Sequence, residues 1–367
     1  MHATEALEEA GRLMIVCNSC RYCEGLCAVF PAMEQRRFFN DGDLNYLANL
    51  CHSCGACFTD CQFAPPHEFA VNVPQALART RAESYAAYAW PKFMAPVFHE
   101  NGWAVAFAAV ASVAGFIGLM GFSIAPRDIF ATWTEPGAFY RIFPHAVLAG
   151  VFGLAFAYAI VALIMGARNF WRDIGEPMAT LAQPVSIWQA MEDAAQLRYL
   201  DGGGDDCYTG RKTDRRRLFH HLTFYGFALC FAATCVATLY HYLLGREAPY
   251  PIYDLPVVLG ALGGVGLTIG PVGLWFGRWK ADPVLRDEKS SGMDRAFLAM
   301  LFLTGVSGLA LLGLRGTPWM NLLLTIHLGL VFALFVTMPY GKMVHGLYRF
   351  LALVRYARES RELKVQE

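Results

Sequence analysis

Six long stretches without a charged side chain constrain this chain more than any other feature. Each is close to the ~20 residues that a helix needs to cross the ~30 Å hydrocarbon core of a bilayer. A soluble core helix rarely stays free of charge over this length, so the stretches predict membrane-spanning helices. Their ranges are Trp103–Ile124, Phe143–Gly166, Leu218–Leu244, Leu255–Gly277, Ala296–Leu314 and Pro318–Gly341.

The basic residues are unevenly divided between the segments that join these stretches. Six spans place both chain ends on one side, which carries 26 of the 30 Lys and Arg residues. By the positive-inside rule this side is cytoplasmic, in a multi-pass protein of a bacterial inner membrane. We expect a cytoplasmic domain over residues 1–100, a six-helix transmembrane domain over 101–350 that includes the cytoplasmic loop 167–217, and a basic cytoplasmic tail over 351–367. The formal net charge is zero, so nothing indicates nucleic-acid binding.

Eight of the eleven cysteines lie within 45 residues, in two copies of the spacing Cys-x2-Cys-x2-Cys-x3-Cys. Four thiolates at this spacing can hold a [4Fe–4S] cluster, and in the bacterial two-cluster arrangement the fourth cysteine of each run binds the cluster of the other run. The runs are Cys17, Cys20, Cys23 and Cys27, then Cys51, Cys54, Cys57 and Cys61. Crossed binding would group Cys17, Cys20, Cys23 and Cys61 on one cluster, and Cys51, Cys54, Cys57 and Cys27 on the other.

Zinc sites and disulfides are the alternative uses of these cysteines. Structural zinc usually takes two separated Cys-x2–4-Cys pairs, and disulfides need an oxidising compartment, whereas no cleavable N-terminal signal is visible. The spacing therefore favours clusters, although Ala28 and Gln62 replace the proline that usually follows the fourth cysteine. In a reducing cytoplasm the remaining Cys207, Cys230 and Cys235 should be free thiols.

The soluble segments predict further helices. In the head these are Thr4–Val16 and Gln75–Ala89, with Arg79 and Arg81 on the solvated face of the second, and a helix and turn over Pro31–Leu50, with Asn40-Asp41-Gly42-Asp43 as its breaker.

The central loop and the fourth span carry two further patterns. Val185–Leu200 has an amphipathic pattern that would suit a helix on the membrane or against the head. Glycines at four-residue spacing in the fourth span indicate close helix packing, with room for a flat ring as the alternative.

Six of the ten histidines lie in or at the ends of the spans: His145, His220, His221, His241, His327 and His345. A polar ring in hydrocarbon is costly unless it has a partner, so such residues indicate function. The third and sixth spans offer histidines at both membrane levels. We expect one or two b-type haems, with His345 paired to His220 or His221 and His327 paired to His241.

Helical phase guides this pairing. His327 and His345, 18 residues apart, would share a face of one helix, and phase favours His220 over His221 as the partner of His241 along the third span. His145 would be a substitute outer ligand or a quinone-site residue.

The chain resembles the tricarballylate-utilization B family, also called citrate-utilization B. The two cysteine runs carry the resemblance, with the His220-His221-Leu-Thr-Phe-Tyr-Gly start of the third span and Gly-Pro271 in the fourth. It implies a membrane protein that reoxidises the flavin of an FAD-dependent, tricarballylate dehydrogenase-like partner. Electrons would pass through iron–sulfur clusters and haem towards the quinone pool.

The predicted fold is mainly α: a two-[4Fe–4S] ferredoxin-like helical head followed by a six-helix transmembrane bundle. The sequence shows no catalytic acid–base or nucleophile constellation and no nucleotide fingerprint, so the chain needs a partner that dehydrogenates the substrate. The alternatives are an anchor for another flavoenzyme, of the cobalamin-synthesis, fumarate-like, glycolate or heterodisulfide type, and a membrane redox sensor.

Overall fold

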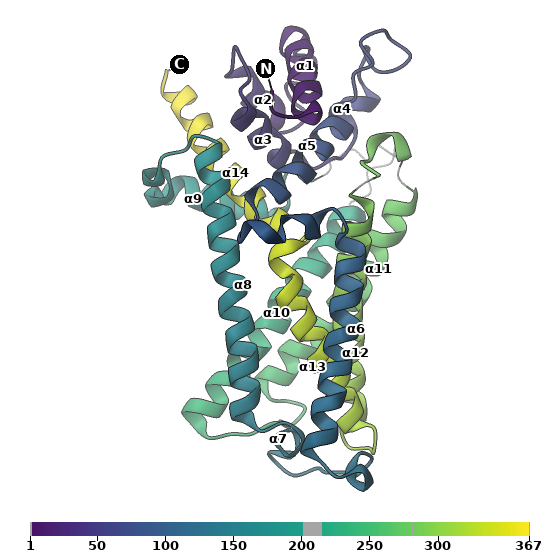
Figure 1. The fold of residues 1–367 in the computed structure, drawn as a ribbon. Coiled ribbons are helices and arrows are strands. Elements are labelled where there is room, and N and C mark those ends of the chain that lie inside the picture. Colours follow the sequence, from purple (N-terminus) through teal and green to yellow (C-terminus); the bar gives the residue numbers. More distant parts are fainter. Residues whose placement is uncertain (1, 201–214, 281, 289, 367) are drawn as a thin grey trace.

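A computed structural model describes residues 2–200, 215–280, 282–288 and 290–366, and the regular elements in these ranges are helices. Figure 1 shows a small helical head at one end and a bundle of long helices below it, with both chain termini at the head end. The mainly α fold, with an N-terminal helical head and six helices of membrane-spanning length in the described ranges, is therefore confirmed. Cys207 lies outside the described residues.

Six helices of the described part are long and apolar enough to cross a membrane, at the expected positions. They are α6 (Asn101–Ser123), α8 (His145–Asp173), α10 (Arg215–Leu244), α11 (Leu255–Lys280), α12 (Ser291–Leu314) and α13 (Met320–Thr337). Trp103, Phe107 and Leu154 are between 76% and 79% exposed on them, as lipid-facing side chains would be. The short η2 (Pro126–Asp128) and α7 (Ala138–Ile142) join α6 to α8 at the end far from the head.

Glycines bring α10 and α11 into backbone contact. A Cβ on Gly266 would lie 2.6 Å from the Leu222 carbonyl oxygen, and one on Gly263 would lie 2.8 Å from the Cys230 amide nitrogen. Only glycine fits such a close approach of two helices. Of the two interpretations of the glycine pattern, close packing is the one that the structure supports.

The head is built from short helices: α1 (Glu5–Cys20), α2 (Val29–Glu34), α3 (Asp41–Leu50), α4 (Ala56–Thr59), α5 (Val73–Tyr88) and η1 (Lys92–Phe98). The expected breaker at Asn40–Asp43 is wrong, because these residues begin α3. The Asn40 side chain accepts the Asp43 N–H at 2.8 Å, and the Asp43 carboxylate accepts the Asn40 N–H at 3.4 Å. This reciprocal cap starts a helix where the sequence alone suggested a turn.

The sixth span does not continue to His345. It ends in η5 (Met338–Tyr340) and the extended Gly341, and a new helix, α14 (Val344–Gln366), follows. Pro339 cannot donate a backbone hydrogen bond, which helps to end the helix there. The expectation that His327 and His345 share one face of a continuous helix is therefore wrong.

Residues 351–366 belong to α14 and not to a tail. Leu351, Ala352, Leu353 and Val354 are buried in the core of the head. In Figure 1 this helix, in yellow, runs from the bundle up into the head. The basic residues that suggested a tail belong to a helix whose apolar side chains need burial, so the expected tail is wrong.

A buried ionic network joins α14 to the head. Arg36 donates to Glu359 at 2.6 Å and to Asp43 at 2.8 Å. Arg355 binds the same two carboxylates, at 2.8 Å and 3.2 Å. Glu176, which follows α8, accepts from Arg358 at 2.6 Å. These contacts connect the head, the second span and the C-terminal helix.

The loop that follows α8 forms η3 (Met178–Ala182) and α9 (Pro184–Gln196), and η4 (Pro283–Leu285) precedes α12. The small or polar Ser186, Ala190 and Asp193 of α9 are buried, and the helix packs on α14. Trp188 and Met191 point outward, 68% and 42% exposed. Of the two expected positions for this helix, contact with the head is the one observed. The apolar side chains of Trp188 and Met191 remain exposed at its edge.

We expect Glu359→Ala to destabilise the protein by about 3–5 kcal/mol, because it leaves Arg36 and Arg355 buried without their shared carboxylate. Glu362→Ala is the matched control one turn along α14. Its side chain is 58% exposed, and its ion pair with Arg358 should contribute less than about 1 kcal/mol. Thermal unfolding in detergent measures both. Equal losses of stability in the two variants would contradict a structural role for the buried network.

Candidate metal centre

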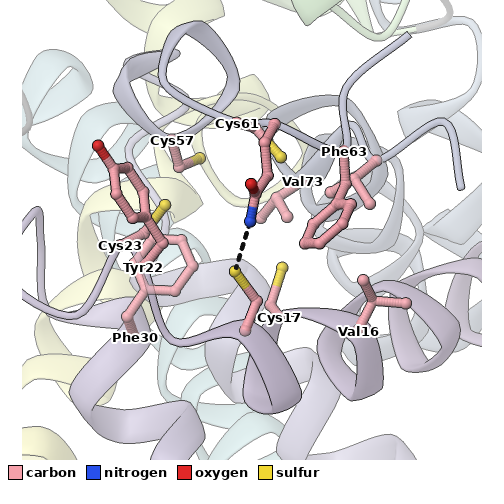
Figure 2. A pocket seen from close by; sticks show the side chains of 12 residues that line it. Val16, Cys17, Tyr22, Cys23, Phe30, Cys57, Cys61, Phe63 and Val73 are labelled. Carbon is pink, nitrogen blue, oxygen red and sulfur yellow. Dashed lines mark hydrogen bonds between the residues drawn. The ribbon is translucent and has the colours of Figure 1, made fainter. Parts of the chain in front are cut away.

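Five cysteines from both runs line one pocket of the head. They are Cys17, Cys20, Cys23 and Cys61, called the distal thiol set below, and Cys57. Tyr22, Phe30, Phe63 and Val73 line the same pocket. Figure 2 shows the sulfurs of Cys17, Cys23 and Cys61 facing the space between these side chains. The Gln62 amide nitrogen lies 3.9 Å from the Cys20 sulfur. This grouping is the one that crossed binding requires.

The other four cysteines line a second pocket. Cys27, Cys51, Cys54 and Cys57 form the proximal thiol set. Burial, followed by the charges of Cys51 and Cys54, raises the pKa of Cys27, which places Cys27 beside the second cysteine run. The Ser53 amide donates to the Cys51 sulfur at 3.3 Å. Phe30, Val73 and Cys57 line both pockets, so the two sets share a wall.

The thiols suit a cluster better than zinc or disulfides. None of the ten cysteines among the described residues forms a disulfide. In the same residues no group of three or more His, Cys, Asp or Glu side chains converges closely enough to hold a single metal ion. Burial, followed by the charges of Cys61, Cys23 and Cys20, raises the pKa of Cys17 to about 12. Such thiols give up their protons only where cations lie among them, and a cubane, which takes each ligand on a different corner iron, fits sulfurs that surround a space.

The proximal set is surrounded by arginines that the sequence analysis did not identify. Arg349 of α14 donates to the Cys51 carbonyl at 2.6 Å, and Arg216 of α10 donates to the His52 carbonyl at 2.9 Å. Arg81, which we expected on a solvated face, is only 8% exposed and donates to the Cys51 carbonyl at 2.5 Å. That expectation is wrong for Arg81, although Arg79 is exposed. Only tertiary contacts reveal these roles, since no spacing links the arginines to the cysteine run.

His220 and His345 meet at the head end of the bundle. Their ring centroids are 6.3 Å apart with an interplanar angle of 73°. His345 Nδ1 lies 2.5 Å from the Lys342 carbonyl oxygen, so this nitrogen carries the proton and Nε2 is left as an acceptor. A histidine whose other nitrogen binds a carbonyl is the usual form of a metal ligand. Burial, followed by the charge of Lys342, lowers the pKa of His345, which keeps the ring neutral as ligation requires.

The neighbouring His221 has a different role. Its Nε2 lies 3.1 Å from the Ala195 carbonyl oxygen of α9, which the Tyr225 hydroxyl also binds, at 2.9 Å. The Nδ1 of His220 is buried and has no hydrogen-bond partner in the part of the chain that the structure describes. Of the two residues that the sequence left open, His220 is the one that faces His345.

The outer histidines do not form the expected pair. His241 stacks on His145, with ring centroids 3.5 Å apart, and His327 binds the Ser307 hydroxyl at 2.9 Å. The pairing of His241 with His327 is therefore wrong, because α13 presents His327 to α12, where a Cβ on Gly308 would lie 3.0 Å from its ring. Stacked imidazoles leave no room for a haem between them, so the outer histidines do not fit a second haem.

Comparison with known proteins covers both parts of the chain. Residues 10–87 match the model of the citrate utilization protein B Fer4-like domain, and residues 95–366 match the model of citrate utilization protein B. The chain belongs to the citrate utilization protein B family. The citrate utilization protein B of Escherichia coli is 49% identical over 372 residues, which cover 98% of this chain and 94% of the relative. No solved structure matches the chain.

Membership of the citrate utilization protein B family agrees with the two-part layout. The Fer4-like match contains both thiol sets, and the second match contains all six histidines of the spans. The family therefore supports an iron–sulfur electron-transfer role for the head, attached to a membrane domain.

Cys27→Ser should alter the cluster of the proximal set and leave that of the distal set intact, because Cys27 faces Cys51 and Cys54. Electron paramagnetic resonance of the reduced variant measures which signal changes. Cys235→Ser, at an exposed cysteine of α10, is the control and should change neither signal. Selective loss of the distal signal would show that each run binds its own cluster.

Proposed function

We propose that this chain carries electrons from the reduced flavin of a partner dehydrogenase to the quinone of a bacterial inner membrane. The observation that supports this most strongly is on α14. His345 and Arg349 lie one helical turn apart, and Arg349 donates to the Cys51 carbonyl at 2.6 Å. One helix thus carries a histidine at the head end of the bundle and also holds the loop of the proximal thiol set. A sensor would not need this direct connection, whereas a conductor does.

The cofactors follow from the donor sets. The distal and proximal thiol sets would each hold one [4Fe–4S] cluster, and His220 and His345 would hold one b-type haem. When bound, these groups supply the one-electron chemistry that connects a flavin to a quinone. The protein's own side chains fix the positions of the ligands, and Phe30 and Val73 form part of the wall that the two pockets share.

The partner follows from the family and from the lack of a dehydrogenation site in the sequence. The Escherichia coli relative is named for citrate utilization, and the wider family resemblance implies an FAD-dependent dehydrogenase of the tricarballylate type. We propose that this partner docks on the head in the cytoplasm, since 26 of 30 basic residues lie on the side of the membrane that carries both termini.

His345→Ala should abolish the b-type absorption of the purified protein, because it removes one of the two ligands of the single haem that fits. His327→Ala is the matched control in the preceding helix, and it should keep the full haem content because its ring is bonded to Ser307. The reduced α-band, normalised to protein, measures both. Loss of about half of the absorption in each variant would instead indicate two haems.

Protein purified anaerobically should contain about eight irons and eight sulfides in two clusters, before haem iron is counted. In liposomes that contain quinone, it should then reoxidise the reduced flavoprotein and form quinol in equal amounts. Cys27→Ser should lower the rate at least tenfold, while Cys235→Ser should leave it unchanged. Flavin oxidation without quinol formation would contradict the conducting function and favour a sensor.

A further inference from the structure

Two guanidinium groups, of the buried Arg81 and the half-buried Arg349, meet at one backbone carbonyl beside the proximal thiol set. Arg81 and Arg349 both donate to the Cys51 carbonyl, at 2.5 Å and 2.6 Å. Arg81 also donates to the Ser53 hydroxyl at 2.9 Å, and Arg349 to the Asn49 carbonyl at 3.3 Å. The two arginines come from different helices, α5 and α14, so this meeting is a feature of the folded head.

Neither guanidinium pairs with a carboxylate of the described residues; their partners are carbonyls and a hydroxyl. Asp294 lies within electrostatic reach of Arg81, but it already pairs with Lys342 at 2.8 Å and with Arg278. Burial, followed by the charge of Arg81, lowers the pKa of Arg349 to about 10, so the group still stays charged at neutral pH. Cations held away from water without an anion to balance their charge are costly, and the proximal thiol set could supply that anion.

The charged side chains near the distal thiol set are exposed to water. Its charged sequence neighbours are Arg21, Glu24 and Asp60, and all three are exposed. Burial, followed by Cys61, Cys20 and then Asp60, raises the pKa of Cys23 to about 11. Exposed charges are screened by water, whereas the charges of the buried Arg81 and the half-buried Arg349 are screened less.

We propose that Arg81 and Arg349 raise the reduction potential of the proximal [4Fe–4S] cluster above that of the distal one. This inference rests on the proposed function, because it requires a cluster in each thiol set. An anionic cluster becomes more negative when it accepts an electron, and the two arginines stabilise that added charge. One electron lost from the distal site is gained by the proximal site, so the charge arrangement directs electrons inward, towards His220 and His345.

The experiment is a potentiometric titration of the full-length, anaerobically purified protein, followed by electron paramagnetic resonance. Cys27→Ser identifies the proximal signal. Arg81→Gln and Arg349→Gln should each lower the equilibrium constant for proximal reduction at least tenfold, which is a fall of at least 59 mV for a one-electron couple. The distal midpoint should not move. Arg79→Gln, on the exposed face of the same helix as Arg81, should shift neither midpoint.

Lysine variants keep the charge and serve as the rescue. In Arg81→Lys and Arg349→Lys the equilibrium constant for proximal reduction should stay within tenfold of the wild-type value. If a glutamine variant fails to assemble its cluster, a tenfold fall of this constant in the corresponding lysine variant overturns the inference. Unchanged proximal midpoints, or equal shifts of both midpoints, in the glutamine variants also overturn it. Iron and sulfide analysis of the same wild-type samples separates the two hypotheses. A chain with only one cluster contradicts the proposed function, whereas two clusters with unshifted midpoints contradict this inference alone.

Discussion

The packing of α14 into the head is the interaction on which the rest of the structure depends. Its central residues are buried, and Arg355 and Glu359 share a closed ionic network with Arg36 and Asp43. Such a network is a weak source of stability in itself, since desolvation offsets most of the attraction, but it tolerates no missing member. It therefore fixes the rotation and height of α14 relative to the head more than it adds free energy.

Fixing α14 also fixes the distance between the head and the membrane histidines. Arg349 lies four positions after His345, which places both on one side of the helix. Arg349 holds the Cys51 carbonyl, and His345 faces His220. A shift of α14 by one residue would rotate these two side chains away from their partners together. The proximal thiol set and the inner histidine pair are thus positioned by one element, and the glycine contacts of α10 with α11 hold the other side of that pair.

The sequence predicted the features that depend on local pattern. Charge-free stretches determine the spans, the repeated spacing determines how the thiols group, and helical phase favoured His220, the residue that faces His345. The sequence analysis missed that the helix ends before His345. Pro339 and Gly341 are the signals for this end, but they lie in an otherwise apolar run that suggested one continuous span. It assigned Arg81 to solvent because an arginine on a short helix is usually exposed, and only the fold brings Arg81 to the Cys51 carbonyl. The outer pairing failed for a related reason: equal depth in the membrane does not make two helices neighbours.

The hydrogen bonds of the ring nitrogens distinguish the histidines from one another. In hydrocarbon each ring nitrogen needs a partner, and His221, His327 and His345 each have one, in Ala195, Ser307 and Lys342. The Nδ1 of His241 has no partner among the described residues, but its ring lies flat on that of His145 at the end of its helix far from the head. His220 is half-buried, its Nδ1 also lacks a partner within the described ranges, and its ring faces His345 without stacking on it. An imidazole in this position is costly unless something else binds there, and a metal held between His220 and His345 would remove that cost.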